Sequence, residues 1–167
     1  MAAALRARSE AVAEEARRVV ILGVGNRLRG DDAVGCVVCD ELKDKLASRM
    51  IDCGSVPENY VQPVADRNPT RILVVDCCNY GAQPGEFRLF SREEVDRLSY
   101  GLLSTHTLPL TLTIEMLSLE TGAAIELLGI QPEQIEFGND LSKPVQRALP
   151  AVVEFVRNWA RAEAPAE

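Results

Sequence analysis

Short, mainly apolar runs recur along the chain and alternate with segments of helical periodicity. The runs lie at residues 19–22, 50–53, 71–76 and 123–130. Apolar runs of this length, bounded by glycine, proline or charged residues, are typical of strands that are buried on both faces, as in a parallel sheet. The pattern therefore predicts a single α/β domain that is built on a parallel sheet.

Segments with one apolar face follow these runs and predict the main helices. Three helices are predicted in this way, at about residues 32–47, 110–120 and 142–162. In the first, Val34, Val38 and Leu42 recur at helical spacing, and acidic and lysine residues fill the opposite face. In the last, Pro150 should kink the helix because proline has no N–H to donate.

Three further segments carry weaker signals. Residues 85–90 alternate between apolar and polar side chains, which predicts a half-exposed edge strand and is compatible with an antiparallel direction. Ser91 and Glu94 have the spacing of a capping box, which predicts a short helix that begins there. Residues 54–60 contain glycine and proline, and we expect them to form a surface loop without regular structure.

The bulk composition bounds the class of protein. The chain has 167 residues and a net charge of −7, which favours one globular domain and argues against a nucleic-acid partner. Its five cysteines are an odd number without a secretory signal, which favours a cytoplasmic location. No apolar stretch approaches the length of a membrane span, so we expect no membrane insertion. We expect residues 1–17 to be an N-terminal extension, 18–163 the α/β domain and 164–167 a frayed tail.

The loop after the first predicted strand is the first candidate for chemistry. Ligands of parallel α/β sheets bind outside the carboxyl ends of the strands, where this loop carries glycines, an asparagine and two aspartates. We expect Gly25, Asn26 and Asp31 to contact the substrate. The loop is not a dinucleotide fingerprint because Leu28 replaces the third glycine, so we expect no nucleotide cofactor. One of the two aspartates could serve only to cap the next helix. A cap needs one aspartate, so the second one needs another role.

Asp32, Asp76 and His106 form a second candidate group. Asp76 ends a predicted strand and His106, the only histidine, precedes a predicted helix, so all three fall at the same edge of the sheet. Two carboxylates and one imidazole form a mixed ligand set that leaves coordination positions open, as catalytic metal sites require. Each residue also has a plainer interpretation, because an aspartate can be a turn residue and a lone histidine a capping residue. Serine hydrolysis is not indicated, because the chain has no Gly-x-Ser-x-Gly motif.

Motifs over most of the chain, from Arg18 to about Arg157, resemble one family of enzymes. The motifs are Gly23-Val24-Gly25-Asn26, Gly30-Asp31-Asp32, Gly35, Val74-Val75-Asp76, Ser104-Thr105-His106-Thr107-Leu108-Pro109-Leu110, Pro57-Glu58-Asn59 and Gly129-Ile130-Gln131-Pro132-Glu133. They resemble those of the endopeptidases that mature [NiFe]-hydrogenase large subunits by removing a C-terminal extension. The last two motifs are similar to those of the branch that serves hydrogenase 3 and related hydrogenases.

The resemblance implies a fold, a site and a partner. It implies a twisted, mostly parallel five-stranded sheet between helices, with Asp32, Asp76 and His106 as the positions that contact nickel. The partner is then a hydrogenase large-subunit precursor that carries the nickel, held by its own cysteines. Carboxylates and one imidazole form a harder ligand set than thiolates, so this site should bind nickel loosely and should not strip it from the precursor.

Several alternatives remain at this stage. A non-enzymatic protein that checks or delivers nickel could use the same three ligands, and so could an unrelated metal-dependent hydrolase of small amides. Cys77 and Cys78 replace the small residues usual in the family, and a thiolate from either could join the metal site. Cys36 and Cys39 share one helical flank, but no second cysteine pair has the spacing of a metal site, so we expect them in the core.

Overall fold

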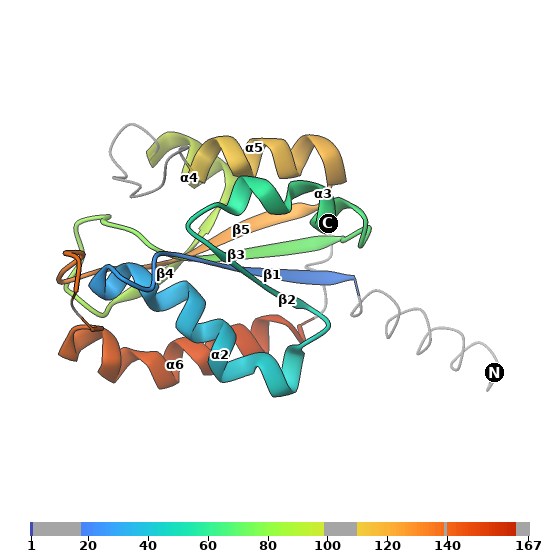
Figure 1. Cartoon of the computed structure of the whole chain (residues 1–167). Helices are drawn as coiled ribbons and strands as arrows, with labels where there is room; N and C mark the ends of the chain where they lie inside the picture. Colours follow the sequence, from blue (N-terminus) through green and yellow to red (C-terminus); the bar gives the residue numbers. More distant parts are fainter. Residues whose placement is uncertain (2–17, 99–109, 139, 163–167) are drawn as a thin grey trace.

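A five-stranded sheet lies between two layers of helices (Figure 1). The computed structural model describes residues 1, 18–98, 110–138 and 140–162. The strand order is β2-β1-β3-β5-β4, with β4 at one edge and antiparallel to β5, while all other neighbours are parallel. This confirms the predicted fold class and the edge strand. The strands are β1 (Val19–Val24), β2 (Met50–Gly54), β3 (Arg71–Cys77), β4 (Phe87–Ser91) and β5 (Ala124–Ile130).

The helices divide between the two faces of the sheet (Figure 1). Helices α2 and α6 cover one face, and α3, α4 and α5 cover the other. The α-helices are α2 (Val34–Leu46), α3 (Val61–Ala65), α4 (Arg92–Leu98), α5 (Leu110–Thr121) and α6 (Lys143–Trp159). Two 3-10 turns, η1 (Gly30–Ala33) and η2 (Pro57–Tyr60), precede α2 and α3.

Alternate residues of the central strands belong to two separate hydrophobic clusters, one on each face of the sheet. In β1, Val20 and Leu22 pack with the cluster under α3, α4 and α5, whereas Val19 and Ile21 pack with α2 and α6. Because successive side chains of a strand point to opposite faces, a strand covered on both faces must be apolar at every position. This is why β1 reads as an uninterrupted apolar run.

Local signals at the helix ends are confirmed in two places. The backbone N–H of Glu94 donates to Ser91 Oγ over 3.2 Å and the Ser91 N–H donates back to Glu94 Oε2 over 2.9 Å, which completes the predicted capping box of α4. Ser142 caps α6 by accepting a hydrogen bond from the Val145 N–H. Helix α6 continues through Pro150, and the predicted kink there stays a prediction.

Two predicted boundaries are wrong. The helix expected from residue 32 begins as the 3-10 turn η1, and α2 follows only from Val34. The loop expected over residues 54–60 is partly helical, because η2 leads into α3. A five-residue helix is too short for hydrophobic periodicity to reveal, and α3 is stabilised by burying Val61 and Val64 against the core. None of the helices within the described ranges combines the length and apolar character that crossing a bilayer requires.

Candidate active site

The carboxyl edge of the sheet brings Asp32 and Asp76 to the same side of the molecule. Strands β1 and β3 are parallel neighbours in which Gly23 pairs with Val75, so Asp76 lies one residue past this pair, where the loop after β1 begins. Asp32 belongs to η1 in that loop, and η1 contacts β3. Both aspartates are buried, with exposed fractions of 0% and 2%. The predicted placement of two carboxylates at one edge of the sheet is therefore confirmed.

The loop after β1 closes on Asp32 through its own backbone. The Asn26 N–H donates to the carbonyl oxygen of Asp32 over 3.1 Å and to its Oδ2 over 3.2 Å, and Asn26 Oδ1 accepts from the Leu28 N–H. Gly25 has a φ of +151°, and a Cβ there would lie 1.8 Å from the Asp32 carbonyl oxygen. Glycine is therefore required at position 25 for the loop to approach Asp32 so closely. The expected contact of Gly25 and Asn26 with substrate stays a prediction.

Asp31 ties this loop to a distant segment. It has no exposed surface, and its two carboxylate oxygens accept three backbone N–H groups, from Ser142 over 2.6 Å, Glu133 over 2.8 Å and Gln134 over 3.1 Å. Arg29 and Ala33 occupy the cap positions of η1 and α2, so neither aspartate is a helix cap. These bonds give Asp31 a positioning role that the sequence did not reveal, and its expected contact with substrate stays a prediction.

Arg27 fixes the outer side of the same loop. Its guanidinium donates to Asp40 Oδ2 in α2 and to Asp52 Oδ2 in β2, each over 2.6 Å, and to the carbonyl oxygen of Cys36 over 3.3 Å. The loop that carries Asp32 is thus joined to a helix and to the edge strand on its other side. Sequence reasoning did not single out Arg27, because its two aspartate partners lie on different elements.

All five cysteines are buried thiols. Burial, followed by the negative charge of Asp76, raises the pKa of Cys77 and of Cys78, so both are protonated at neutral pH. The possible contribution of a thiolate from Cys77 or Cys78 to the metal site stays a prediction. Cys36 and Cys39 are also buried, and burial raises the pKa of Cys39 to about 12, which confirms their predicted place in the core.

His106 lies outside the described residues, and its role as a ligand stays a prediction. Helix α5 begins at Leu110, toward the same edge of the sheet as the two aspartates (Figure 1). Among the residues that the structure describes, no three His, Cys, Asp or Glu side chains are grouped so that they could hold a metal ion. A three-ligand site of the predicted kind therefore needs a ligand from outside these ranges.

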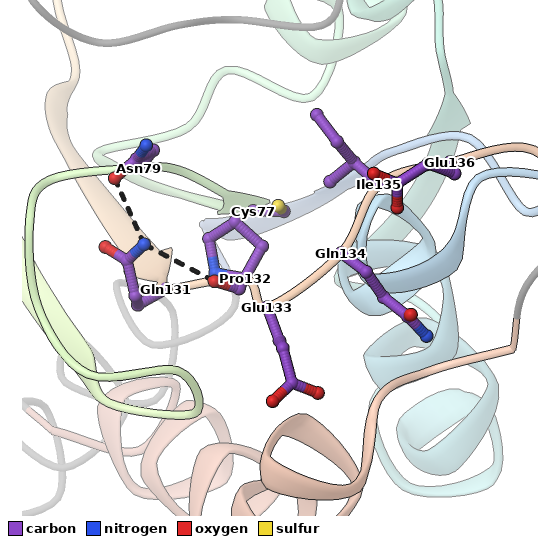
Figure 2. A pocket seen from close by; sticks show the side chains of 8 residues that line it. All are labelled: Cys77, Asn79, Gln131, Pro132, Glu133, Gln134, Ile135 and Glu136. Carbon is purple, nitrogen blue, oxygen red and sulfur yellow. Dashed lines mark hydrogen bonds between the residues drawn. The ribbon is translucent and has the colours of Figure 1, made fainter.

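A cavity of about 170 Å³ opens at the carboxyl edge of the sheet, where Cys77 at the end of β3 is part of its lining. Figure 2 shows that the chain after β5 and the chain after β3 supply its walls. The Gln131 side chain joins the two walls, because Oε1 accepts from the Tyr80 and Ala82 N–H groups and Nε2 donates to Asn79 Oδ1 over 3.1 Å. The lining residues are Cys77, Asn79, Gln131, Pro132, Glu133, Gln134, Ile135 and Glu136.

Polar groups form part of the lining of this cavity. It offers backbone and amide groups together with two exposed carboxylates, those of Glu133 and Glu136. Sequence reasoning included Gln131 only as part of a motif that resembles the hydrogenase 3 branch and gave it no role. The signal that could have identified Gln131 is its position at the carboxyl end of a buried strand.

Comparison with known proteins defines the class of this site. A sequence profile of the hydrogenase maturation protease family matches residues 36–159. The chain therefore belongs to the hydrogenase maturation protease family, and it is an endopeptidase of hydrogenase maturation. This excludes the alternatives of a non-enzymatic nickel carrier and of an unrelated amide hydrolase.

Individual relatives agree with this assignment. The hydrogenase 3 maturation protease of Escherichia coli K12 is 32% identical over 84% of this chain and 89% of its own length. A putative hydrogenase maturation protease of Methanocaldococcus jannaschii is 34% identical over 72% of this chain and 76% of its own. The crystal structure of a [NiFe] hydrogenase maturation protease from Thermococcus kodakarensis superposes with a TM-score of 0.75 at 30% identity, over 87% of this chain and 94% of that one.

Proposed function

We propose that the protein removes the C-terminal extension of a [NiFe]-hydrogenase large-subunit precursor after that precursor has received its nickel. The observation that carries this proposal is the pair of buried carboxylates, Asp32 and Asp76, that two different elements place at one edge of the sheet. Carboxylates favour a cation, and they leave the softer thiolate ligands to the precursor. The similarity to a hydrogenase 3 maturation protease points to the same class of substrate.

In this proposal the nickel belongs to the substrate. Asp32, Asp76 and His106 contact the nickel only when the precursor is bound. Binding to the nickel then selects precursors whose own active site already holds the metal, and it fixes the precursor relative to the protease. The cavity lined by Cys77 and Glu136 then receives the chain next to the bond that is cut, because it lies at the same edge of the sheet as the two aspartates. The rigid loop around Asp32 suits such a role, since recognition of a metal requires ligands held in fixed positions.

We infer that the protein acts in the cytoplasm. All five cysteines are free thiols in the structure, and free thiols persist in a reducing compartment.

One experiment tests the proposed activity directly. The protein is incubated with nickel-loaded and with nickel-free large-subunit precursor, and the mass of each precursor is followed over time. We expect a mass loss that matches the C-terminal extension in the loaded precursor alone. Equal cutting of both precursors would reject the role of nickel, and no cutting of either would reject the proposed substrate.

A further inference from the structure

Two large apolar side chains are exposed beside the candidate active site. Leu28 and Phe137 have exposed fractions of 68% and 69%. They belong to segments far apart in the sequence, which a hydrogen bond from the Gly138 N–H to the Leu28 carbonyl oxygen joins over 2.9 Å. Side chains exposed to this extent bury little apolar surface in the fold, and their common position beside the site makes them available to a binding partner.

The backbone that presents these side chains is held firmly. The Arg29 Nε donates to the Ile135 carbonyl oxygen over 3.2 Å, and its guanidinium lies 5.0 Å from the centre of the Phe137 ring. The Asp31 N–H donates to the Gln134 carbonyl oxygen over 2.9 Å, in addition to the three bonds that the Asp31 carboxylate accepts. A binding surface that is fixed before the partner arrives loses little entropy on association.

The position of these side chains indicates which partner they meet. Leu28 lies in the loop that closes on Asp32, and Phe137 directly follows Ile135 and Glu136 in the wall of the cavity. A peptide that occupies the cavity and passes Asp32 would therefore run along both side chains. A second copy of the chain is a poorer occupant, because a stable interface buries about 1,600 Å² in total and two side chains supply only a small part of that.

We propose that Leu28, Arg29 and Phe137 form a docking patch for an apolar segment of the precursor next to the scissile bond. This inference rests on the proposed function and adds a substrate-contacting surface to it. The patch binds apolar side chains on Leu28 and Phe137, with the Arg29 guanidinium stacked on the ring. The exposed carboxylates of Glu133 and Glu136 beside it disfavour acidic residues in the same segment.

The test compares serine variants of the patch with a matched control. The variants are Leu28→Ser, Phe137→Ser and their double variant, and the control is Leu119→Ser on α5, where an exposed leucine (80%) lies outside the patch. Binding of nickel-loaded large-subunit precursor is measured by isothermal titration calorimetry, and its processing is followed over a range of precursor concentrations. Thermal unfolding confirms that each variant is folded.

We expect each patch variant to bind the precursor about tenfold more weakly, because a buried apolar side chain contributes roughly this factor or more. The half-saturating precursor concentration should rise by a similar factor and by more than any change in the limiting rate. Phe137→Leu should retain most of the affinity, and Leu119→Ser should behave like the wild type.

The other outcomes separate failure of the docking patch from failure of the proposed function. Unchanged binding in the double variant, or an equal loss in Leu119→Ser, would show that the patch does not contact the precursor. Loss of self-association in the double variant, measured by sedimentation, with unchanged precursor binding would assign the surface to a second copy. If the wild type binds the precursor through the patch but cuts neither form of it, the proposed function fails while the docking surface stands. Absence of binding by the wild type rejects both.

Discussion

The two loops that carry the candidate carboxylates are held in different ways. The loop after β1 is joined to α2 and β2 through Arg27, to the segment before α6 through Asp31, and to itself through Asn26. The loop after β3 is joined to one segment alone, the chain after β5, by the side chain of Gln131 and by backbone hydrogen bonds that pair Cys78 with Ile130, and Gly85 and Glu86 with Gln131, as far as the described residues show. The loop that carries Asp32 is therefore held by contacts to several elements, whereas the chain that follows Asp76 is held mainly against one segment, where Gln131 supplies the side-chain bonds. The comparison predicts that substitutions in the two loops will have distinguishable effects on stability and on processing.

The largest effect is expected where the two loops meet the substrate. Asp32→Asn, Asp76→Asn and His106→Ala should each abolish or severely slow processing of nickel-loaded precursor, because each removes a proposed contact to the metal. Ligands of one centre act jointly, so a double variant should be little worse than the worst single one. Single-turnover processing by variants shown to be folded by circular dichroism measures this. A near-normal rate in any variant would remove that residue from the site.

The next largest effect is expected at Asp31, whose hydrogen bonds join the loop after β1 to the segment before α6. Asp31→Ala leaves three backbone N–H groups without their acceptor, and it should lower the free energy of unfolding by about 3 kcal/mol or more. Urea denaturation measures the change. Asp44→Ala, which alters an exposed aspartate of α2, is the control and should change the free energy of unfolding by less than about 0.5 kcal/mol. Equal stabilities of the two variants would show that the first loop is held mainly by other contacts.

A smaller effect is expected in the second loop. Gln131→Ala removes the acceptor of the Tyr80 and Ala82 N–H groups and should lower the free energy of unfolding by about 1–2 kcal/mol. Processing should slow as well, because the chain after Asp76 and one wall of the cavity are loosened. Gln62→Ala, whose side chain makes an exposed bond to Asp66, is the control. Wild-type processing by a destabilised Gln131→Ala protein would mean that this loop does not position the site.

The same contrast explains how much the sequence could predict. The parallel strands, the antiparallel edge strand and the capping box were predictable, because apolar runs, alternation and a three-residue spacing are local signals. The common edge of Asp32 and Asp76 followed from topology, because parallel strands end on the same side. The role of Asp31 was not predictable, since its partner Glu133 lies 102 residues further along the chain and contributes only a backbone N–H. Arg27 and Gln131 were missed because their partners lie on other elements of the fold.

The smallest effect is expected at the outer side of the first loop, and it should depend on pH. Burial is the largest influence on Asp52 and opposes its ionisation, but the hydrogen bonds from Arg27, Gly54 and Cys36, together with the charge of Arg27, outweigh burial and lower the pKa of that carboxyl group. A carboxyl group with a lowered pKa in the folded state stabilises the fold above its unfolded value, about 3.9, and this contribution is lost as the pH falls through the folded value.

The Arg27–Asp52 ion pair is partly exposed, with side-chain exposed fractions of 44% and 38%, so solvent should limit its contribution to about 1 kcal/mol or less. Asp52→Asn should therefore reduce the free energy of unfolding slightly at pH 7 and should flatten its decline below about pH 4. Urea denaturation of the wild type and the variant at pH 7 and at pH 3, in low and in high salt, measures this change in the free energy of unfolding. A variant whose loss of stability is the same at pH 7 and pH 3 would show that packing, and not the ion pair, is what Asp52 contributes to this loop.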